Sequence, residues 1–126
     1  MGFFTPEQRD TLFLMHRHDE LYEDMLGFLE GTFDSFVTTH VAPGAHKNDK
    51  EEIFDVAQFK ALGEMGFIAM PFEEAYGGME ACFSYYNAGL ESLAKADAGF
   101  ALAVAIHGTM SDGIARFGSE DRKSVV

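Results

Sequence analysis

Apolar residues recur at steps of three and four along much of this chain, which is the spacing of one face of an α-helix. The clearest run follows Asp19 and consists of Leu21, Met25, Phe28, Leu29, Phe33, Phe36 and Val37. This run predicts a long helix that buries its apolar face in the core and ends before Pro43. Residues 42–52 combine Pro43 and Gly44 with several charged side chains, and this composition is typical of a loop.

A separate helix is predicted before this long one. Thr5 is suited to cap a helix, Pro6 to occupy its first position, and Gln8 to reach back to the cap. These signals predict a helix over residues 6–18. His16 and His18 stand two positions apart on it, a spacing that directs two side chains to different sides, and we expect both to face solvent.

Signals at residues 55–81 predict two further helices joined by a turn. Asp55 begins the first, which ends at Gly66 in the left-handed conformation that glycine tolerates. The sequence Tyr76-Gly77-Gly78 then requires a permissive backbone and is typical of a tight turn. A second helix is predicted over residues 81–96.

The most apolar stretch of the chain is residues 98–106, directly after Asp97, which we expect to be the N-cap of a helix. A helix that is apolar on nearly all sides is expected at the centre of a domain. Ser119 and Glu120 then resemble the start of another helix. No window alternates apolar and polar residues in the way of a strand. The pattern as a whole predicts an all-α fold, a helical bundle of five to six helices.

Length and charge restrict the possible functions. A chain of 126 residues suits one domain with its own core. It has 9 Lys+Arg against 21 Asp+Glu, so its net charge of −12 repels phosphate backbones and argues against nucleic-acid binding. No apolar run approaches a membrane span in length. The single cysteine, Cys82, cannot close an intrachain disulfide, and we expect it to be a small buried residue of a cytoplasmic protein.

Few residues fit the patterns of metal or nucleophile chemistry. None of the five histidines follows a glutamate by three positions, the spacing of di-metal sites in helical bundles, so we expect no metal site. No serine lies in a Gly-x-Ser-x-Gly motif, and no catalytic residue is predicted. His107 is the polar exception in an apolar segment, so it is either hydrogen-bonded in the core or lines a cavity.

Several motifs carry a family resemblance. Residues 59–71 read Phe-Lys-Ala-Leu-Gly-Glu-Met-Gly-Phe-Ile-Ala-Met-Pro, and residues 73–78 read Glu-Glu-Ala-Tyr-Gly-Gly. Farther along, residues 90–97 read Leu-Glu-Ser-Leu-Ala-Lys-Ala-Asp, and residues 116–121 read Arg-Phe-Gly-Ser-Glu-Asp. In this order the segments resemble the N-terminal all-α domain of the acyl-CoA dehydrogenase family.

The resemblance implies a fragment of a longer flavoenzyme. Residues 1–18 would be an extra N-terminal helix, and residues 19–126 the N-terminal helical domain, truncated before a β-barrel domain. In this family the β-barrel domain and a C-terminal helical domain bind FAD, a glutamate removes the α-proton of an acyl-CoA thioester, and the flavin accepts the β-hydride.

For this chain the resemblance therefore implies no catalytic residue, no activity alone and no tightly bound FAD. The intact enzyme would be a homo-oligomer, located in the cytoplasm or, in a eukaryote, the mitochondrial matrix.

The resemblance also suggests which residues meet the substrate. Residues 103–107 resemble the stretch of helix that lines the base of the family's acyl-chain pocket. Ala103 and Val104 would leave room there, His107 would place a polar group at the far end, and Tyr76 would belong to a turn at the pocket's edge. Two alternatives stay open, namely the same domain of an acyl-CoA oxidase or flavin monooxygenase, and a stand-alone helical module for acyl binding or assembly.

Overall fold

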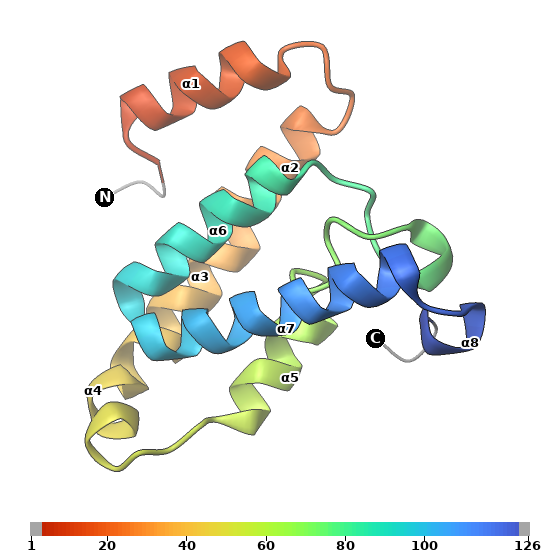
Figure 1. Cartoon of the computed structure of the whole chain (residues 1–126). Helices are drawn as coiled ribbons and strands as arrows, with labels where there is room; N and C mark the ends of the chain where they lie inside the picture. The colour runs from red at the N-terminus through yellow and green to blue at the C-terminus, as the bar shows by residue number, and fades with distance from the viewer. Residues whose placement is uncertain (1–3, 124–126) are drawn as a thin grey trace.

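The computed structural model describes residues 4–123, apart from the Phe13 side chain. These residues contain no strand and form a helical bundle, which confirms the predicted all-α class (Figure 1). The principal helices are α1 (Pro6–His16), α2 (Tyr22–Phe28), α4 (Ala42–Lys50), α5 (Val56–Glu64), α6 (Phe83–Ala96) and α7 (Ala98–Phe117). Shorter helical segments are η1 (Leu29–Phe33), α3 (Asp34–Phe36), η2 (Val37–Val41), η3 (Glu74–Tyr76) and α8 (Glu120–Lys123). The outer ends of the predicted regions 1–18 and 19–126 lie outside the described residues.

The predicted helix starts are confirmed by their hydrogen bonds. The backbone N–H of Gln8 donates to the Thr5 hydroxyl at 3.2 Å, and the Thr5 N–H donates to the Gln8 side chain at 2.9 Å. Asp55 accepts from the N–H three residues later at 2.9 Å, and Asp97 does the same at 3.0 Å. Each cap satisfies an N–H that the first turn of a helix leaves without a partner.

The predicted loop at residues 42–52 is wrong over most of its length. The chain is helical without interruption from α2 to the end of α4 at Lys50, and only residues 51–55 leave the helix. The reason lies in η2, which is wound as a π-helix just before Pro43. Pro43 then occupies the start of the α-helical segment α4, where a missing N–H and a fixed φ are tolerated.

The centre of the core is a stack of aromatic rings from three elements. Phe67 has no exposed surface, and its ring centroid lies 4.5 Å from that of Phe33 and 5.1 Å from that of Tyr86. Gly89 permits this close approach, because a Cβ there would lie 2.3 Å from the Phe67 ring. The stack holds residues 67–72 against α6. Gly66, directly before them, has a φ of 96°, which confirms the predicted left-handed conformation.

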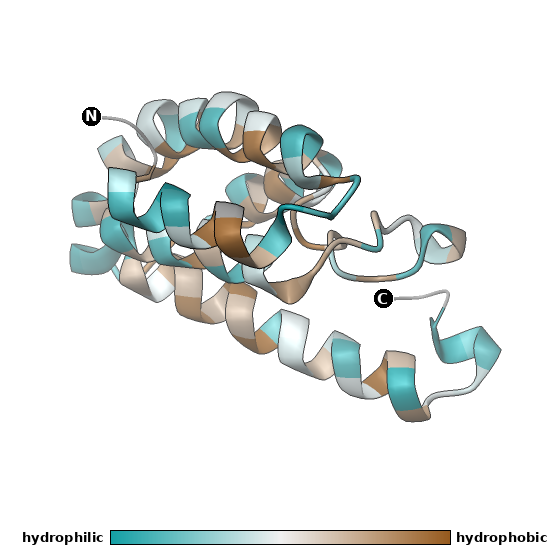
Figure 2. Cartoon of the chain, turned by 90° about the horizontal axis from the view of Figure 1, so that it is seen from above, coloured by the Kyte–Doolittle hydropathy of each residue, from teal (hydrophilic) through white to brown (hydrophobic). Residues whose placement is uncertain are grey.

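α7 is less enclosed than its composition predicts. It packs against α6, its partner across the single residue Asp97, and Val104 is fully buried. Its outer face, however, leaves Leu102 61% exposed, Ile106 56% and Met110 64%. The prediction that this apolar helix lies at the centre of the domain is therefore wrong. No described element covers its outer face, and α7 lies at the edge of the bundle in Figure 2.

Cys82 is also more exposed than predicted. It occupies the N-cap position of α6, outside the helix, while the buried positions of the first turn belong to Tyr85 and Tyr86. Its expected burial is therefore wrong. Within residues 4–123, no helix combines the length and apolar character that crossing a membrane requires.

Candidate functional site

A pocket of about 260 Å³ lies between α7 and the segment 68–76. From α7 it is lined by His107, Ser111 and Ala115, which share one face because they are four residues apart. The opposite side includes the apolar residues Ile68, Pro71 and Phe72 together with Tyr76. The pocket therefore combines an apolar wall with a polar strip on one helix.

Within residues 4–123, three of the four charged side chains in the lining are paired, those of Asp112, Arg116 and Lys123, and Glu73 is not. Arg116 Nε donates to Asp112 Oδ2 at 2.8 Å, and Lys123 Nζ donates to Glu120 Oε1 at 3.1 Å. The Tyr76 hydroxyl also donates to Glu120. These hydrogen bonds, that from Tyr76 first, lower the pKa of the Glu120 carboxyl, and the same contact raises the pKa of the Tyr76 hydroxyl.

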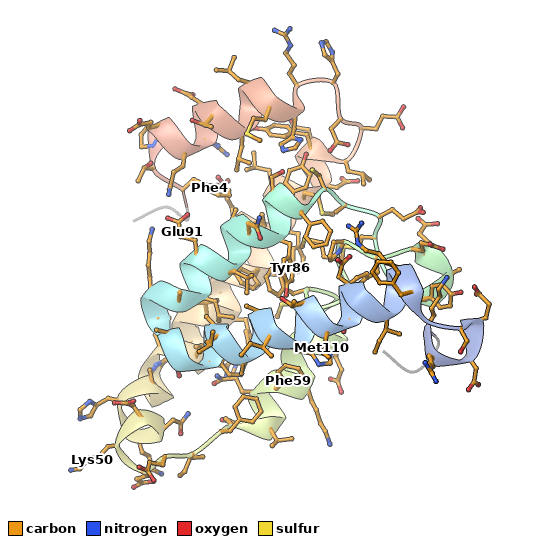
Figure 3. The ribbon with its side chains drawn as sticks, in the orientation of Figure 1. Phe4, Lys50, Phe59, Tyr86, Glu91 and Met110 are labelled. Carbon is orange, nitrogen blue, oxygen red and sulfur yellow. The ribbon has the colours of Figure 1, made fainter. Side chains whose placement is uncertain are left out.

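The structure places the three predicted pocket residues in different surroundings. His107 is half-buried in the pocket lining, with its ring edge-on to Phe59 at a centroid distance of 5.3 Å. Phe59 lies on α5 beside α7 (Figure 3). Ala103 is half-buried on the same face, one turn before His107 and outside the pocket lining. Val104 lies in the core, where its carbonyl accepts from the Tyr86 hydroxyl at 3.4 Å.

Two polar residues in this pocket extend the sequence prediction. Tyr76, which the family resemblance placed in a turn at the edge of the acyl-chain pocket, lines this pocket from η3. Ser111 was missed, although it is 4% exposed and contributes to the lining. The sequence did contain one indication of this position. Ser111 follows His107 by four residues, and residues at that spacing face the same side of a helix.

A second polar cluster joins α1 to α6. His16 was predicted to face solvent but is only 9% exposed, so that prediction is wrong. Its Nε2 contacts the Ser84 hydroxyl, and its ring lies 4.6 Å from that of Tyr85. The burial results from α1 folding back onto the start of α6, a contact between residues far apart in sequence.

The residues around His16 do not form a hydrogen-bonded Ser-His-Asp relay. His16 Nδ1 lies 4.0 Å from Asp19 Oδ2, which is beyond hydrogen-bonding distance. The Asp19 carboxylate instead accepts from the Leu21 N–H at 2.9 Å and from the Tyr85 hydroxyl at 2.8 Å. The cluster therefore anchors α1 and the following turn to α6.

These contacts predict an acid-dependent loss of stability. Hydrogen bonds from Leu21 and Tyr85 hold the pKa of Asp19 below its ordinary value of 3.8. The carboxylate therefore stabilises the fold above pH 3.8, and its contribution disappears as the pH falls through the lower, folded-state pKa. We expect the free energy of unfolding, measured by urea titration, to fall less between about pH 6 and about pH 3 in Asp19→Asn than in the wild type.

Asp10→Asn is the control for this measurement, because Asp10 is an exposed carboxylate in the middle of α1. It should retain the wild-type dependence on pH. If the free energy of unfolding depended on pH equally in Asp19→Asn and in the wild type, the assigned role of Asp19 would be contradicted.

The described residues offer no cluster for a metal. No group of three or more histidine, cysteine, aspartate or glutamate side chains within residues 4–123 is arranged to hold an ion. The polar strip of the pocket on α7 consists instead of single hydrogen-bonding groups beside an apolar wall, a combination that suits an organic ligand.

Comparisons with known proteins identify the family. Residues 28–125 match the family described as "Acyl-CoA dehydrogenase, N-terminal domain". The mitochondrial short-chain specific acyl-CoA dehydrogenase of Mus musculus is 30% identical over 96 residues, which cover 75% of this chain and 23% of that protein. Its counterpart in Sus scrofa is 28% identical over 114 residues, 90% of this chain and 27% of that protein.

A bacterial relative gives the same result. Benzylmalonyl-CoA dehydrogenase of Aromatoleum aromaticum is 32% identical over 82 residues, which cover 65% of this chain and 22% of that protein. No solved structure matches the chain. The matched part of this chain corresponds to about a quarter of the length of these relatives. Since the family match covers most of the chain, this protein belongs to the acyl-CoA dehydrogenase family, and residues 28–125 are its N-terminal all-α domain.

Proposed function

We propose that this domain forms one wall of the acyl-chain pocket in an FAD-dependent enzyme that dehydrogenates acyl-CoA thioesters between the α and β carbons. The observation that carries the proposal is the pocket of about 260 Å³ on α7, whose lining includes His107 within a domain of this family. A pocket of this volume is smaller than most ligand sites, which hold roughly 300–1,000 Å³. It therefore suits the acyl end of a substrate and not its nucleotide.

Each of the three predicted residues has a distinct proposed role. His107 contacts the far end of the acyl group from the pocket lining. Ala103 lies one turn earlier on the same face of α7. Its side chain is a single methyl group and therefore leaves room for the acyl chain. Val104, fully buried, supports α7 from the core side and so sets the position of the other two.

The residues described do not fit a flavin site by themselves. The turn at Gly77 and Gly78 is the nearest approach to a glycine-rich cradle, but the space beside Gly78 is filled by the chain. A Cβ at Gly78 would lie 2.0 Å from the carbonyl oxygen of Phe72. We propose that FAD and the glutamate base are held by a β-barrel domain and a C-terminal helical domain, and that residues 1–126 alone are inactive.

The exposed face of α7 supports this division of the enzyme. Leu102, Ile106 and Met110 present an apolar stripe, and such stripes mark surfaces that another protein element covers. We propose that the further domains of the enzyme cover it. The intact enzyme is proposed to be a homo-oligomer of the cytoplasm or, in a eukaryote, of the mitochondrial matrix.

The test compares the 126-residue chain with a longer protein that contains it. The longer protein should carry flavin absorbance, and an acyl-CoA substrate should bleach it and then reduce an electron acceptor. The 126-residue chain should be colourless and inactive. Stoichiometric flavin on this chain would contradict the proposal.

Two other results would favour the alternative functions. Rapid formation of peroxide from oxygen by the longer protein would indicate an oxidase. Binding of acyl-CoA by the 126-residue chain, together with a longer protein that carries no flavin and has no activity, would indicate a stand-alone acyl-binding module.

A further inference from the structure

Ser111 differs from the other hydroxyl-bearing residue in the same part of α7. Thr109, which is exposed, donates its hydroxyl to the carbonyl of Ala105 at 2.9 Å, the usual arrangement within a helix. Ser111 is only 4% exposed, and none of the hydrogen bonds among residues 4–123 involves its hydroxyl. Because Ser111 lines the pocket, its hydroxyl is available there to hydrogen-bond a ligand atom or water.

The neighbour of Ser111 in the pocket is a second hydrogen-bonding group. His107 precedes it by one helical turn and lines the same pocket. Its ring makes an edge contact with Phe59, and no hydrogen bond to its nitrogens is found in the described part of the chain. A hydroxyl and an imidazole N–H that line one face can both donate to a single acceptor group.

The remainder of the pocket sets the chemistry around that acceptor. The formal charges of its lining cancel, because it contains two carboxylates, Glu73 and Asp112, and two cations, Arg116 and Lys123. Lys123 is held by Glu120, a third carboxylate outside the lining, at 3.1 Å. Asp112 is held by Arg116 at 2.8 Å, which limits its repulsion of an anion. Apolar contact is provided by Ile68 and Phe72.

We propose that this pocket receives an acyl group whose far end carries a hydrogen-bond acceptor, specifically a carboxylate. His107 and Ser111 donate to the carboxylate oxygens, and the methylene chain lies against the apolar wall. The inference rests on the proposed function, in which this pocket meets the acyl group. It adds the substrate class, an acid-ended acyl thioester in preference to a purely aliphatic one.

The test measures binding of two N-acetylcysteamine thioesters to the 126-residue chain by NMR titration. One is the monothioester of adipic acid, and the other is its apolar isostere, in which an isopropyl group replaces the carboxylate. The adipate thioester should bind about tenfold more tightly, because a hydrogen bond to a charged group contributes that much. Ser111→Ala and His107→Phe should each remove most of this preference, and the shifted resonances should include those of the pocket.

Thr109→Ala is the matched control, because it removes a hydroxyl from the same helix outside the pocket lining. It should retain the preference. Equal or tighter binding of the apolar isostere would overturn the carboxylate inference while leaving acyl binding in place. Failure of both thioesters to bind would also overturn it, and the flavin-bleaching assay on the longer protein would then decide separately whether the proposed function stands.

Discussion

Phe67→Ala is expected to lower the free energy of unfolding by about 3–5 kcal/mol, the usual cost of deleting a buried aromatic side chain. The Phe67 ring is fully buried and stacks on Phe33 and Tyr86, so the substitution removes contacts on both of its faces. The glycine at position 89 offers no side chain that could fill the space. Urea denaturation followed by circular dichroism measures the change.

Phe117→Ala is the control for this change, because Phe117 is 89% exposed and the same atoms are deleted. It should alter the free energy of unfolding by no more than about 0.5 kcal/mol. Similar losses for Phe67→Ala and Phe117→Ala would show that the aromatic stack is not the centre of the core. The loss expected for Phe67→Ala is a large part of the total free energy of unfolding, which is only about 5–15 kcal/mol for a typical domain.

The second large effect is expected at the exposed face of α7. Leu102, Ile106 and Met110 are spaced by four residues, so they form one continuous stripe. We expect the 126-residue chain to self-associate reversibly through this stripe. The three side chains occur on both associating copies. If each of these six contributes about 0.5 kcal/mol, replacing all three residues with glutamine should raise the dissociation constant roughly 100-fold. Sedimentation velocity over a range of concentrations provides the measurement.

Leu14 and Met15 allow a matched control for the stripe. They are 69% and 62% exposed on α1, away from α7, and their replacement by glutamine removes comparable apolar surface. This double variant should self-associate as the wild type does. Undiminished association of the α7 variant would assign the contact to another surface, and the stripe would lose its support as the site for further domains.

Features that depend on a few neighbouring residues could be predicted from sequence. The caps at Thr5, Asp55 and Asp97 each involve a partner three residues away, so the local pattern contains both members of the hydrogen bond. The positive φ of Gly66 follows from the same local logic. Pro43 shows where local prediction fails. Proline is expected to end a helix, but the π-helical segment η2 precedes Pro43 and the chain stays helical through it.

The polar residues of the interior were harder to predict. His16 is buried because α6 happens to cover it, and nothing within residues 6–18 indicates that contact. His107 was recognised as either a hydrogen-bonded core residue or a cavity residue, and the structure places it in a pocket lining. Ser111 has an unremarkable sequence context, and its burial is visible only once the segment 68–76 lies opposite α7.

The sequence by itself determined where the helices begin, which residues share a helical face and to which family the order of motifs belongs. Helical periodicity and capping act within a few residues, so the local chain carries that information. Only the tertiary structure decided which apolar face of α7 is covered and which stays open, and which polar groups meet in the pocket. Burial depends on segments distant in the chain, and Leu102 and Val104 are equally apolar although one is exposed and the other enclosed.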